Sequence, residues 1–365
     1  MDIRSRVLAV LNRHKPERVP WMGDLDYWIA GLTSRGELPE RYRGEGIFQL
    51  HRDLNVGFYL QGYFPYRSNY EGLQVSEERR GDLRLTRVNT PVGGVECVEK
   101  YLPESACWAY LERYVKSWRD LPAVRYWYEH TYYEPDYQLA QERCELIGDL
   151  GLVLCYLPKS PLMELVALLA GIRVVTYAQA DAPEELAETL TVLRSKADEA
   201  AAIALASPAE CLMIPENLSS EVVGKRLYNQ YMHEYEESWA GKIKAAGKYS
   251  FIHMDGTLSG LIDEVASAGF TVLEALTPAP VGDLSVEELA QRVGERAVIW
   301  GGLPGVYFSD LVSQAEFDRF VISVLETMRS EPRFVLGVAD QVPPGTSWER
   351  IRRVSELVEQ YGEMA

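Results

Sequence analysis

Short apolar runs alternate with longer segments of helical periodicity along most of this 365-residue chain. This strand–helix rhythm is typical of parallel β/α units. About eight units favour a closed barrel over an open doubly wound sheet, and no Gly-x-Gly-x-x-Gly segment follows the first run. We therefore predict an α/β fold, a single-domain (β/α)8 TIM barrel over residues 1–365 with an N-terminal helix. The expected strands are Val19–Asp24, Gly57–Gln61, Gly151–Leu157, Cys211–Ile214, Tyr249–His253, Phe270–Glu274, Ala297–Gly301 and Phe334–Val338.

One interval, at about residues 71–133, breaks the rhythm and is rich in Arg, Glu and aromatic residues. It contains Thr90-Pro91-Val92-Gly93-Gly94, which indicates a hairpin turn. We interpret it as an inserted excursion from the barrel, placed to cover the mouth. Its aromatic residues, dense over 101–137, would line a pocket for an aromatic substrate. Ordinary packing beneath a lid or at a dimer contact is the alternative that we favour.

Charge and composition narrow the choice of partners and compartment. The net charge of −17 argues against nucleic acid or an anionic membrane as partner, because phosphate groups need clustered Lys and Arg. No apolar run reaches the ~18–20 residues of a membrane-spanning helix, and residues 1–16 carry no secretory signal pattern. The five scattered cysteines do not suggest a disulfide framework. These features indicate a cytoplasmic protein.

Several polar residues stand where apolar runs end, which in a barrel of this kind is where the reacting groups lie. Carboxylates gathered at one mouth raise one another's pKa unless a cation holds them. Asp, Glu and His together form an oxygen- and nitrogen-rich site that suits a divalent metal. The alternative for each residue is a helix N-cap or a loop position. The residues are Asp24, Asp26, Lys159, Glu216, Asn217, His253, Asp255, Glu274 and Asp340.

Three segments together are similar to a known family. They are residues 4–22 with Arg18-Val19-Pro20, the Trp300-Gly-Gly-Leu303 run, and Phe334–Thr346 with its Val-Pro-Pro-Gly-Thr sequence. As a set they resemble the uroporphyrinogen decarboxylase superfamily over nearly the whole chain. The resemblance implies a (β/α)8 barrel with its site at the C-terminal mouth, in agreement with the strand–helix rhythm.

The true decarboxylases of that superfamily carry two arginines just after the first strand, which hold the carboxylates of the porphyrinogen. Here Trp21-Met22 is followed by Gly23-Asp24-Leu25-Asp26-Tyr27, so both arginines are missing and two acids stand nearby. Asp340 takes approximately the place of their late histidine. A polycarboxylate would be repelled, and we do not expect uroporphyrinogen as substrate.

The corrinoid-dependent methyltransferases form the second branch, and the resemblance is closer there. Their thiol-methylating members bind zinc through a His-x-Cys segment and a later Cys, and His253-Met254-Asp255 and Asp340 stand at those places. Replacing both thiolates by carboxylates argues against a thiol acceptor and favours a harder metal acting as Lewis acid toward oxygen. The branch implies transfer of methyl from a small methylated substrate to a corrinoid protein, with O-demethylase as one form.

On this resemblance the roles divide as follows. Zinc or another divalent metal is held by His253, Asp255 and Asp340, with Glu216 as fourth ligand. Glu274 and Asp24 are the catalytic acids, and Tyr27, Glu216 and Asn217 bind substrate. A partner protein supplies the corrinoid over the barrel mouth, and relatives often form a homodimer.

Two other functions stay open. One is a metal-independent decarboxylase or lyase on a small non-porphyrin substrate, with Asp24 and the mouth carboxylates stabilising a cationic intermediate. The other is a non-catalytic homologue that binds a ligand or partner. Among the remaining histidines, we expect His14 and His51 on the surface and His233 packed within a helix.

Overall fold

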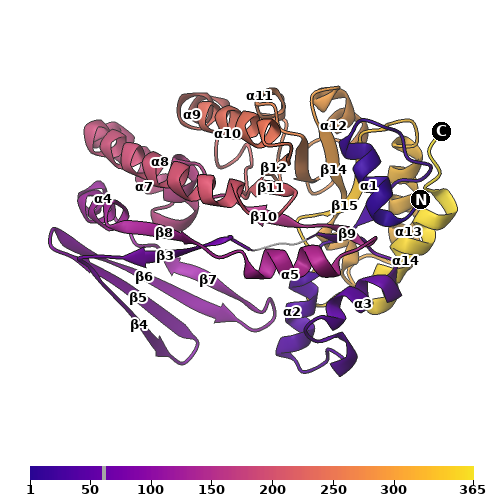
Figure 1. Cartoon of the computed structure of the whole chain (residues 1–365), viewed down its shortest axis with the longest axis horizontal. Coiled ribbons are helices and arrows are strands. Elements are labelled where there is room, and N and C mark those ends of the chain that lie inside the picture. The colour runs from indigo at the N-terminus through magenta and orange to yellow at the C-terminus, as the bar shows by residue number, and fades with distance from the viewer. Residues whose placement is uncertain (60–62) are drawn as a thin grey trace. The chain divides into compact units, whose positions relative to one another are not determined.

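The computed structural model describes residues 1–59 and 63–365 and divides the chain into two compact units (Figure 1). Unit 1 comprises Met1–Tyr63, Gln138–Tyr156 and Pro208–Ala365, and unit 2 comprises Phe64–Tyr137 and Leu157–Ser207. The inserted excursion at about 71–133 lies inside unit 2, which also includes the segment 157–207. The expectation of a single domain stays a prediction.

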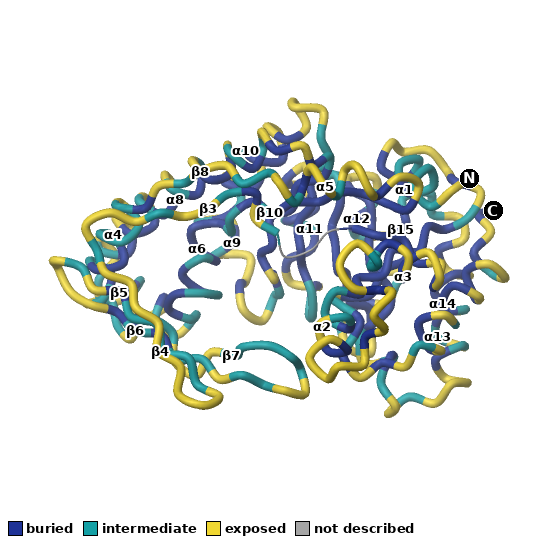
Figure 2. The backbone as a smooth tube through the Cα atoms, turned by 60° about the horizontal axis from the view of Figure 1, so that its bottom comes forward, coloured by how far each residue is buried: buried dark blue, intermediate teal, exposed yellow. Residues whose placement is uncertain are grey.

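Unit 1 is built on a curled parallel sheet of seven strands, in the order β1-β15-β14-β13-β12-β11-β10. This confirms the α/β class and the parallel arrangement expected from the alternation of strands and helices. Strands β11 to β15 are buried along nearly their whole length, as strands covered on both faces must be (Figure 2). The strands are β1 (Trp21–Met22), β10 (Leu154–Tyr156), β11 (Cys211–Ile214), β12 (Tyr249–His253), β13 (Val272–Leu276), β14 (Val298–Pro304) and β15 (Phe334–Ala339).

A second, two-stranded parallel sheet in unit 1 pairs β2 (Phe58–Tyr59) with β9 (Gly151–Leu152). The N–H of Gly57 donates to the carbonyl of Trp21 at 2.9 Å, which links the start of β2 to β1. Closure of the sheet into a complete eight-stranded barrel stays a prediction. Of the expected strand at 57–61, residues 60 and 61 lie outside the described residues.

The helices of unit 1 begin where the sequence supplies caps. Ser285 and Ser313 each form a capping box with the Glu three residues later, and Ser347 caps the last helix. The helices are α1 (Ile3–Leu11), α2 (Asp26–Ser34), α3 (Gly46–Leu54), α5 (Gln138–Leu146), α9 (Lys225–Tyr231), α10 (His233–Ala245), α11 (Ile262–Ser267), α12 (Val286–Val293), α13 (Gln314–Thr327) and α14 (Trp348–Tyr361), with short 3₁₀ turns η1 (Glu40–Tyr42) and η4 (Gly305–Phe308).

One side-chain cluster forms the interior of unit 1. Because side chains alternate along a strand, the same face of each strand supplies it. β12 contributes Phe251, β13 contributes Val272 and β14 contributes Val298 and Trp300, while α1 adds apolar residues of its own. The face of β12 and β13 that carries Phe251 and Val272 is also the face that carries their polar C-terminal residues.

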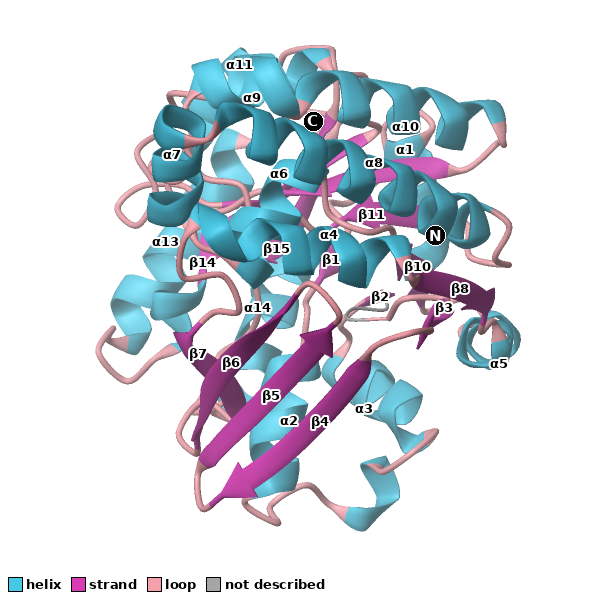
Figure 3. Ribbon diagram, turned by 90° about the vertical axis from the view of Figure 1, so that its left-hand side faces the viewer, coloured by secondary structure: helices cyan, strands magenta, loops and turns pink. Residues whose placement is uncertain are grey.

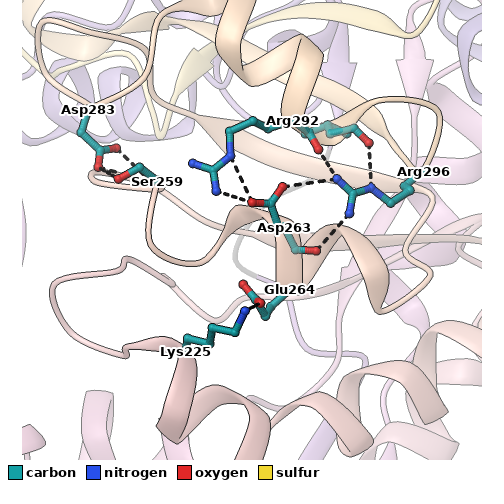
Figure 4. Close-up of polar contacts among 8 residues, drawn as sticks. Lys225, Ser259, Asp263, Glu264, Asp283, Arg292 and Arg296 are labelled. Carbon is teal, nitrogen blue, oxygen red and sulfur yellow. Dashed lines mark hydrogen bonds and ion pairs between the residues drawn. The ribbon is translucent and has the colours of Figure 1, made fainter.

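Polar contacts anchor the loop that follows β12 (Figure 4). Asp283 Oδ1 accepts hydrogen bonds from the N–H groups of Leu258 and Ser259, at 2.7 and 3.2 Å. Asp263, on α11, pairs with Arg292 of α12 and with Arg296. The chain directly after the end of β12 is therefore held by side chains from the next β/α unit.

Unit 2 contains a four-stranded antiparallel sheet of β4 (Gln74–Arg80), β5 (Leu83–Thr90), β6 (Gly93–Leu102) and β7 (Cys107–Glu112) (Figure 3). Thr90 pairs with Gly93 across the β5–β6 turn, which confirms the predicted hairpin. A second antiparallel pair joins β3 (Tyr66–Tyr70) to β8 (Thr131–Pro135).

The helices of unit 2 include the longest in the described chain, α8 (Pro183–Leu205). The segment before it bends through α6 (Pro161–Met163) into a π-helix, η3 (Glu164–Leu169). The remaining helical segments are η2 (Trp118–Asp120), α4 (Leu121–Glu129) and α7 (Ile172–Asp181). No described helix in either unit has the length and apolar character needed to cross a membrane.

The expectation that His51 lies on the surface is wrong. The side chain points inward from α3, and the residue is 2% exposed. Its Nδ1 lies 3.3 Å from the carbonyl oxygen of Val56, and its ring meets Phe58 edge-on at 5.0 Å. Burial lowers the pKa of His51 to about 4, because charging the imidazole away from water is unfavourable.

Candidate active site

The C-terminal ends of neighbouring strands in unit 1 bring acids and a histidine together. His253 closes β12 and pairs in register with Glu274 on β13, so their side chains are neighbours on one face. Asp340 directly follows β15, and Asp24 lies two residues after β1. β1 is paired with β15, so these two acids also leave adjacent strands. The location agrees with the strand-end site expected from the sequence.

A buried ion pair forms the centre of this cluster. His253 Nδ1 lies 2.6 Å from Glu274 Oε2, and the Tyr59 hydroxyl donates to Glu274 Oε1 at 3.1 Å. The Glu274 side chain is 1% exposed and that of His253 is 11% exposed. Both carboxylate oxygens of Glu274 are therefore engaged, and the imidazole is oriented with its Nε2 3.9 Å from Asp340 Oδ1.

The charge on His253 depends on its acidic neighbours. Burial alone lowers the pKa of the imidazole, but the charge of Glu274, the hydrogen bond to it, and the charges of Asp340 and Asp255 raise that pKa to about 9. The histidine is then an imidazolium at neutral pH, with one N–H directed to Glu274 and the other toward Asp340.

The neighbouring carboxyl groups resist ionisation. Burial raises the pKa of Asp24 well above its ordinary value, and the charges of Asp26, Glu274 and Asp340 raise it further. Desolvation and the charges of Asp255 and Glu274 raise the pKa of Asp340, although His253 opposes this. The Asp340 side chain is 57% exposed, so solvent screens the effect there. Asp24 is the acid that most favours its protonated form.

Backbone strain is concentrated at the same strand ends. Ala275, directly after Glu274, has φ +63°, and Asp340 has φ +76°, both in the left-handed region that residues other than Gly seldom adopt. The pairing of β13 with β14 is irregular between Leu273 and Leu276. Such strain persists where surrounding structure holds it, and it is common at functional sites.

Glu216 has a second buried acid as its neighbour. Its charge raises the pKa of Glu236 on α10, where burial is the larger cause, and Tyr228 of α9 donates to Glu236 at 2.6 Å. Glu216 is itself buried, two residues beyond the end of β11. Its expected contacts with a metal and with substrate stay predictions.

The other residues expected at the site differ in position. Asp255 is close enough to act on the pKa of both His253 and Asp340, and its N–H donates to the Leu218 carbonyl. Asn217 is exposed with φ +53°, and Tyr27 is half-buried in the first turn of α2. Lys159 belongs to unit 2. Contact of Tyr27 and Asn217 with substrate stays a prediction.

Sequence reasoning missed Tyr59. This tyrosine ends the described part of β2, is 3% exposed, and holds the second oxygen of Glu274. Its ring also meets Trp300 edge-on at 5.0 Å. The available signal was its place in the second apolar run, but a tyrosine within such a run is usually a packing residue.

The side chains of this cluster provide only part of what a metal ion needs as ligands. His253 Nε2 and Asp340 Oδ1 supply one nitrogen and one oxygen, and Glu274 is the kind of carboxylate that orients a metal-binding imidazole. Among residues 1–59 and 63–365, however, no three His, Cys, Asp or Glu side chains are arranged to hold a metal ion. The four-ligand site of His253, Asp255, Asp340 and Glu216 stays a prediction.

The fold and the cluster together define the class of protein. It is an α/β protein built on a parallel sheet, with a histidine–carboxylate cluster at the C-terminal ends of the strands. The family model described as uroporphyrinogen decarboxylase (URO-D) matches residues 165–361, more than half of the chain. The chain belongs to the uroporphyrinogen decarboxylase family. This confirms the resemblance to that family, and the matched residues include the Trp-Gly-Gly-Leu and Pro-Pro-Gly-Thr segments.

Solved structures with a similar fold include a methyltransferase from Methanosarcina mazei. It has a TM-score of 0.65 and 13% sequence identity, with 99% of each chain covered. A structure described as a candidate vitamin-B12-independent methionine synthase from Listeria monocytogenes has a TM-score of 0.43 and 11% identity, covering 95% of this chain and 98% of the other. At these identities the first shows a shared fold alone, and the second carries no argument. No curated protein sequence matches the chain.

Proposed function

We propose that this chain is a methyltransferase that removes a methyl group from a small methylated substrate and passes it to a corrinoid held by a partner protein. O-demethylation is the form that the site supports best. The observation that carries the proposal is the His253–Glu274 ion pair, which presents a second imidazolium N–H at the barrel mouth. The missing arginines after β1 argue against the porphyrinogen substrate.

The chain's own contribution is proton donation to the leaving oxygen. When the methyl–oxygen bond breaks, both of its electrons stay on oxygen, and an unprotonated alkoxide or phenoxide leaves poorly. His253 Nε2–H donates the proton, and Glu274 stabilises the imidazolium beforehand through Nδ1–H. General acid catalysis of this kind contributes ~10²–10⁴-fold. The corrinoid supplies the nucleophile that accepts the methyl group.

Glu274 and Asp24 have separate tasks in this proposal. Glu274 accepts hydrogen bonds from both His253 and Tyr59, so it holds the acid in place and is not itself the proton donor. Asp24, buried and with a raised pKa, is a second proton donor beside it. This modifies the catalytic role expected for Glu274 to a positioning role.

A zinc or other divalent ion remains part of the proposal as a testable addition. His253 and Asp340 would hold it, and it would supply a Lewis acid toward the same oxygen. Because a third protein ligand is not gathered among the described residues, the proposed proton donation by His253 does not depend on the ion.

The first test measures metal content and methyl transfer on the same preparations. Protein purified without chelator is analysed for bound metal and assayed with methoxylated and N-methylated substrates and cob(I)alamin as acceptor. We expect His253→Ala to lower methyl transfer by at least ~100-fold, while His14→Ala, on the exposed N-terminal surface, leaves it unchanged. Stoichiometric metal lost in His253→Ala and Asp340→Ala would support the ion. Full activity of His253→Ala would overturn the proposal.

A metal-independent lyase or decarboxylase is the second candidate, and the protonated character of Asp24 favours it. The ionised carboxylates nearby would stabilise a cationic intermediate, and the buried, protonated Asp24 would return a proton to carbon. Release of CO2 from small carboxylic acids, lost in Asp24→Asn and retained in His253→Ala, would distinguish this function from methyl transfer.

A further inference from the structure

Unit 2 contains a cavity of about 420 Å³ that the proposed function does not use. Every residue that lines it belongs to unit 2, so the cavity is a property of that unit. A volume in this range is typical of sites for small molecules. Eight of the eighteen lining residues are aromatic, with rings from β3, β7, α4 and β8 and from the segment after β7.

The rings support one another at defined angles. Trp127 meets Tyr114 edge-on at 5.2 Å and Tyr70 at 6.4 Å, and Tyr66 meets Tyr133 edge-on at 5.3 Å. Burial raises the pKa of Tyr66 and Tyr133, so these phenols stay neutral. The wall therefore contains several uncharged, electron-rich rings packed against one another.

A single carboxylate interrupts this aromatic wall. Glu164 Oε1 accepts a hydrogen bond from the Tyr128 hydroxyl at 2.6 Å, and Glu164 is half-buried where it lines the cavity. It begins η3, where Ala170 N–H donates five residues back to Leu165 at 2.6 Å. π-Helical turns of this kind occur often at functional sites, because they re-aim side chains at some cost in stability.

We propose that this pocket binds a small alkylammonium cation, with the methylated ammonium head against the aromatic rings and Glu164 as counter-ion. Ring faces attract cations and repel anions, and methylated ammonium groups are the ligands that such cages recognise. A plain apolar pocket would have no use for a carboxylate in its wall. An anion would meet both the ring faces and Glu164 unfavourably.

Lys159 also lines the cavity. Burial raises the pKa of Glu164, and the hydrogen bond from Tyr128 and the charge of Lys159 oppose that rise. The positive charge of Lys159 weakens the binding of a second cation. Replacing Lys159 by an uncharged residue is therefore expected to raise the affinity for a cation, and replacing Glu164 is expected to lower it. The two substitutions thus test the proposal in opposite directions.

The test is a calorimetric titration of the full chain with choline and with 3,3-dimethylbutan-1-ol, its uncharged carbon isostere. Choline is expected to bind at least ten-fold more tightly, because only the charge differs. Equal affinities, tighter binding of the alcohol, or no binding of choline would each overturn the proposal. The comparison uses unaltered protein, so it does not depend on whether a variant folds.

Substitutions then test which residues contribute to cation binding. Glu164→Gln is expected to weaken choline binding at least ten-fold, and Lys159→Met to strengthen it a few-fold. Tyr177→Phe, at a 61% exposed tyrosine outside the pocket, should leave affinity unchanged. A Glu164→Gln protein that keeps the wild-type melting temperature and the wild-type affinity would contradict the assignment. Binding is measured without any methyl acceptor, so the result is independent of the methyltransferase proposal.

Discussion

At the scale of single residues, two buried histidines have opposite charge states. His253 and His51 are both buried, but His253 lies against Glu274 and is protonated, whereas His51 lies against the Val56 carbonyl and is neutral. Burial opposes the charged form in both, and only an adjacent carboxylate reverses it. The local sequence around each histidine does not show this difference.

The neutral state of His51 predicts a pH-dependent stability. Its folded pKa of about 4 is below the unfolded value of 6.5, so the unfolded chain binds more protons between these values. The contribution of the neutral His51 to the free energy of unfolding is therefore fully present above pH ~6.5. It falls by about 3 kcal/mol as the pH is lowered toward ~4. Denaturant unfolding of wild type and His51→Leu across this range measures the difference.

The control is His14→Leu, at an exposed histidine, which should keep the wild-type pH dependence. If His51→Leu loses stability in acid as steeply as wild type, the buried imidazole is not the source.

At the scale of elements, the contact between β13 and β14 determines how Glu274 is presented. Gly301 has φ +149°, and a Cβ there would lie 2.5 Å from the carbonyl oxygen of Leu276. Only glycine allows β14 to approach the irregular end of β13 so closely. Ala275, with φ +63°, lies within that irregular end and directly follows the positioning carboxylate.

We expect Gly301→Ala to destabilise the fold by roughly 3 kcal/mol, because its Cβ meets backbone that cannot move aside. Gly241→Ala, within α10 and with open space around it, should be neutral or stabilising by up to ~1 kcal/mol. Thermal unfolding of both variants gives the comparison. An unchanged melting temperature for Gly301→Ala would show that the strands can separate there at little cost.

At the scale of the whole molecule, Asp and Glu outnumber Lys and Arg, and many of these acids take part in ion pairs or cap the N-termini of helices. The pKa of Asp263 is lowered by its bond to Arg292, that of Asp318 by Arg353, and those of Glu288 and Glu316 by capping contacts. Lowered pKa values at exposed carboxylates contribute little individually, and they add up over a chain of net charge −17.

This distribution predicts acid unfolding below pH ~4. The folded pKa values of these carboxylates are below their unfolded values, so their stabilisation is present above the unfolded pKa and is lost as the pH falls through the folded one. Melting temperature measured from neutral pH downward should fall most steeply there, and salt should reduce the fall. A melting temperature constant to pH ~2 would contradict the prediction.

The sequence by itself determined the parallel strands of unit 1 and the family. The strand–helix rhythm and the Thr90–Gly94 turn depend on local periodicity and turn chemistry, and these are readable residue by residue. His253, Glu274, Asp24 and Asp340 were found because strand ends in a parallel sheet share an edge. Only the tertiary structure decided their roles. It paired Glu274 with Tyr59, buried His51 and gathered the rings of unit 2 around Glu164, because burial and the nearest charge depend on residues far away in sequence.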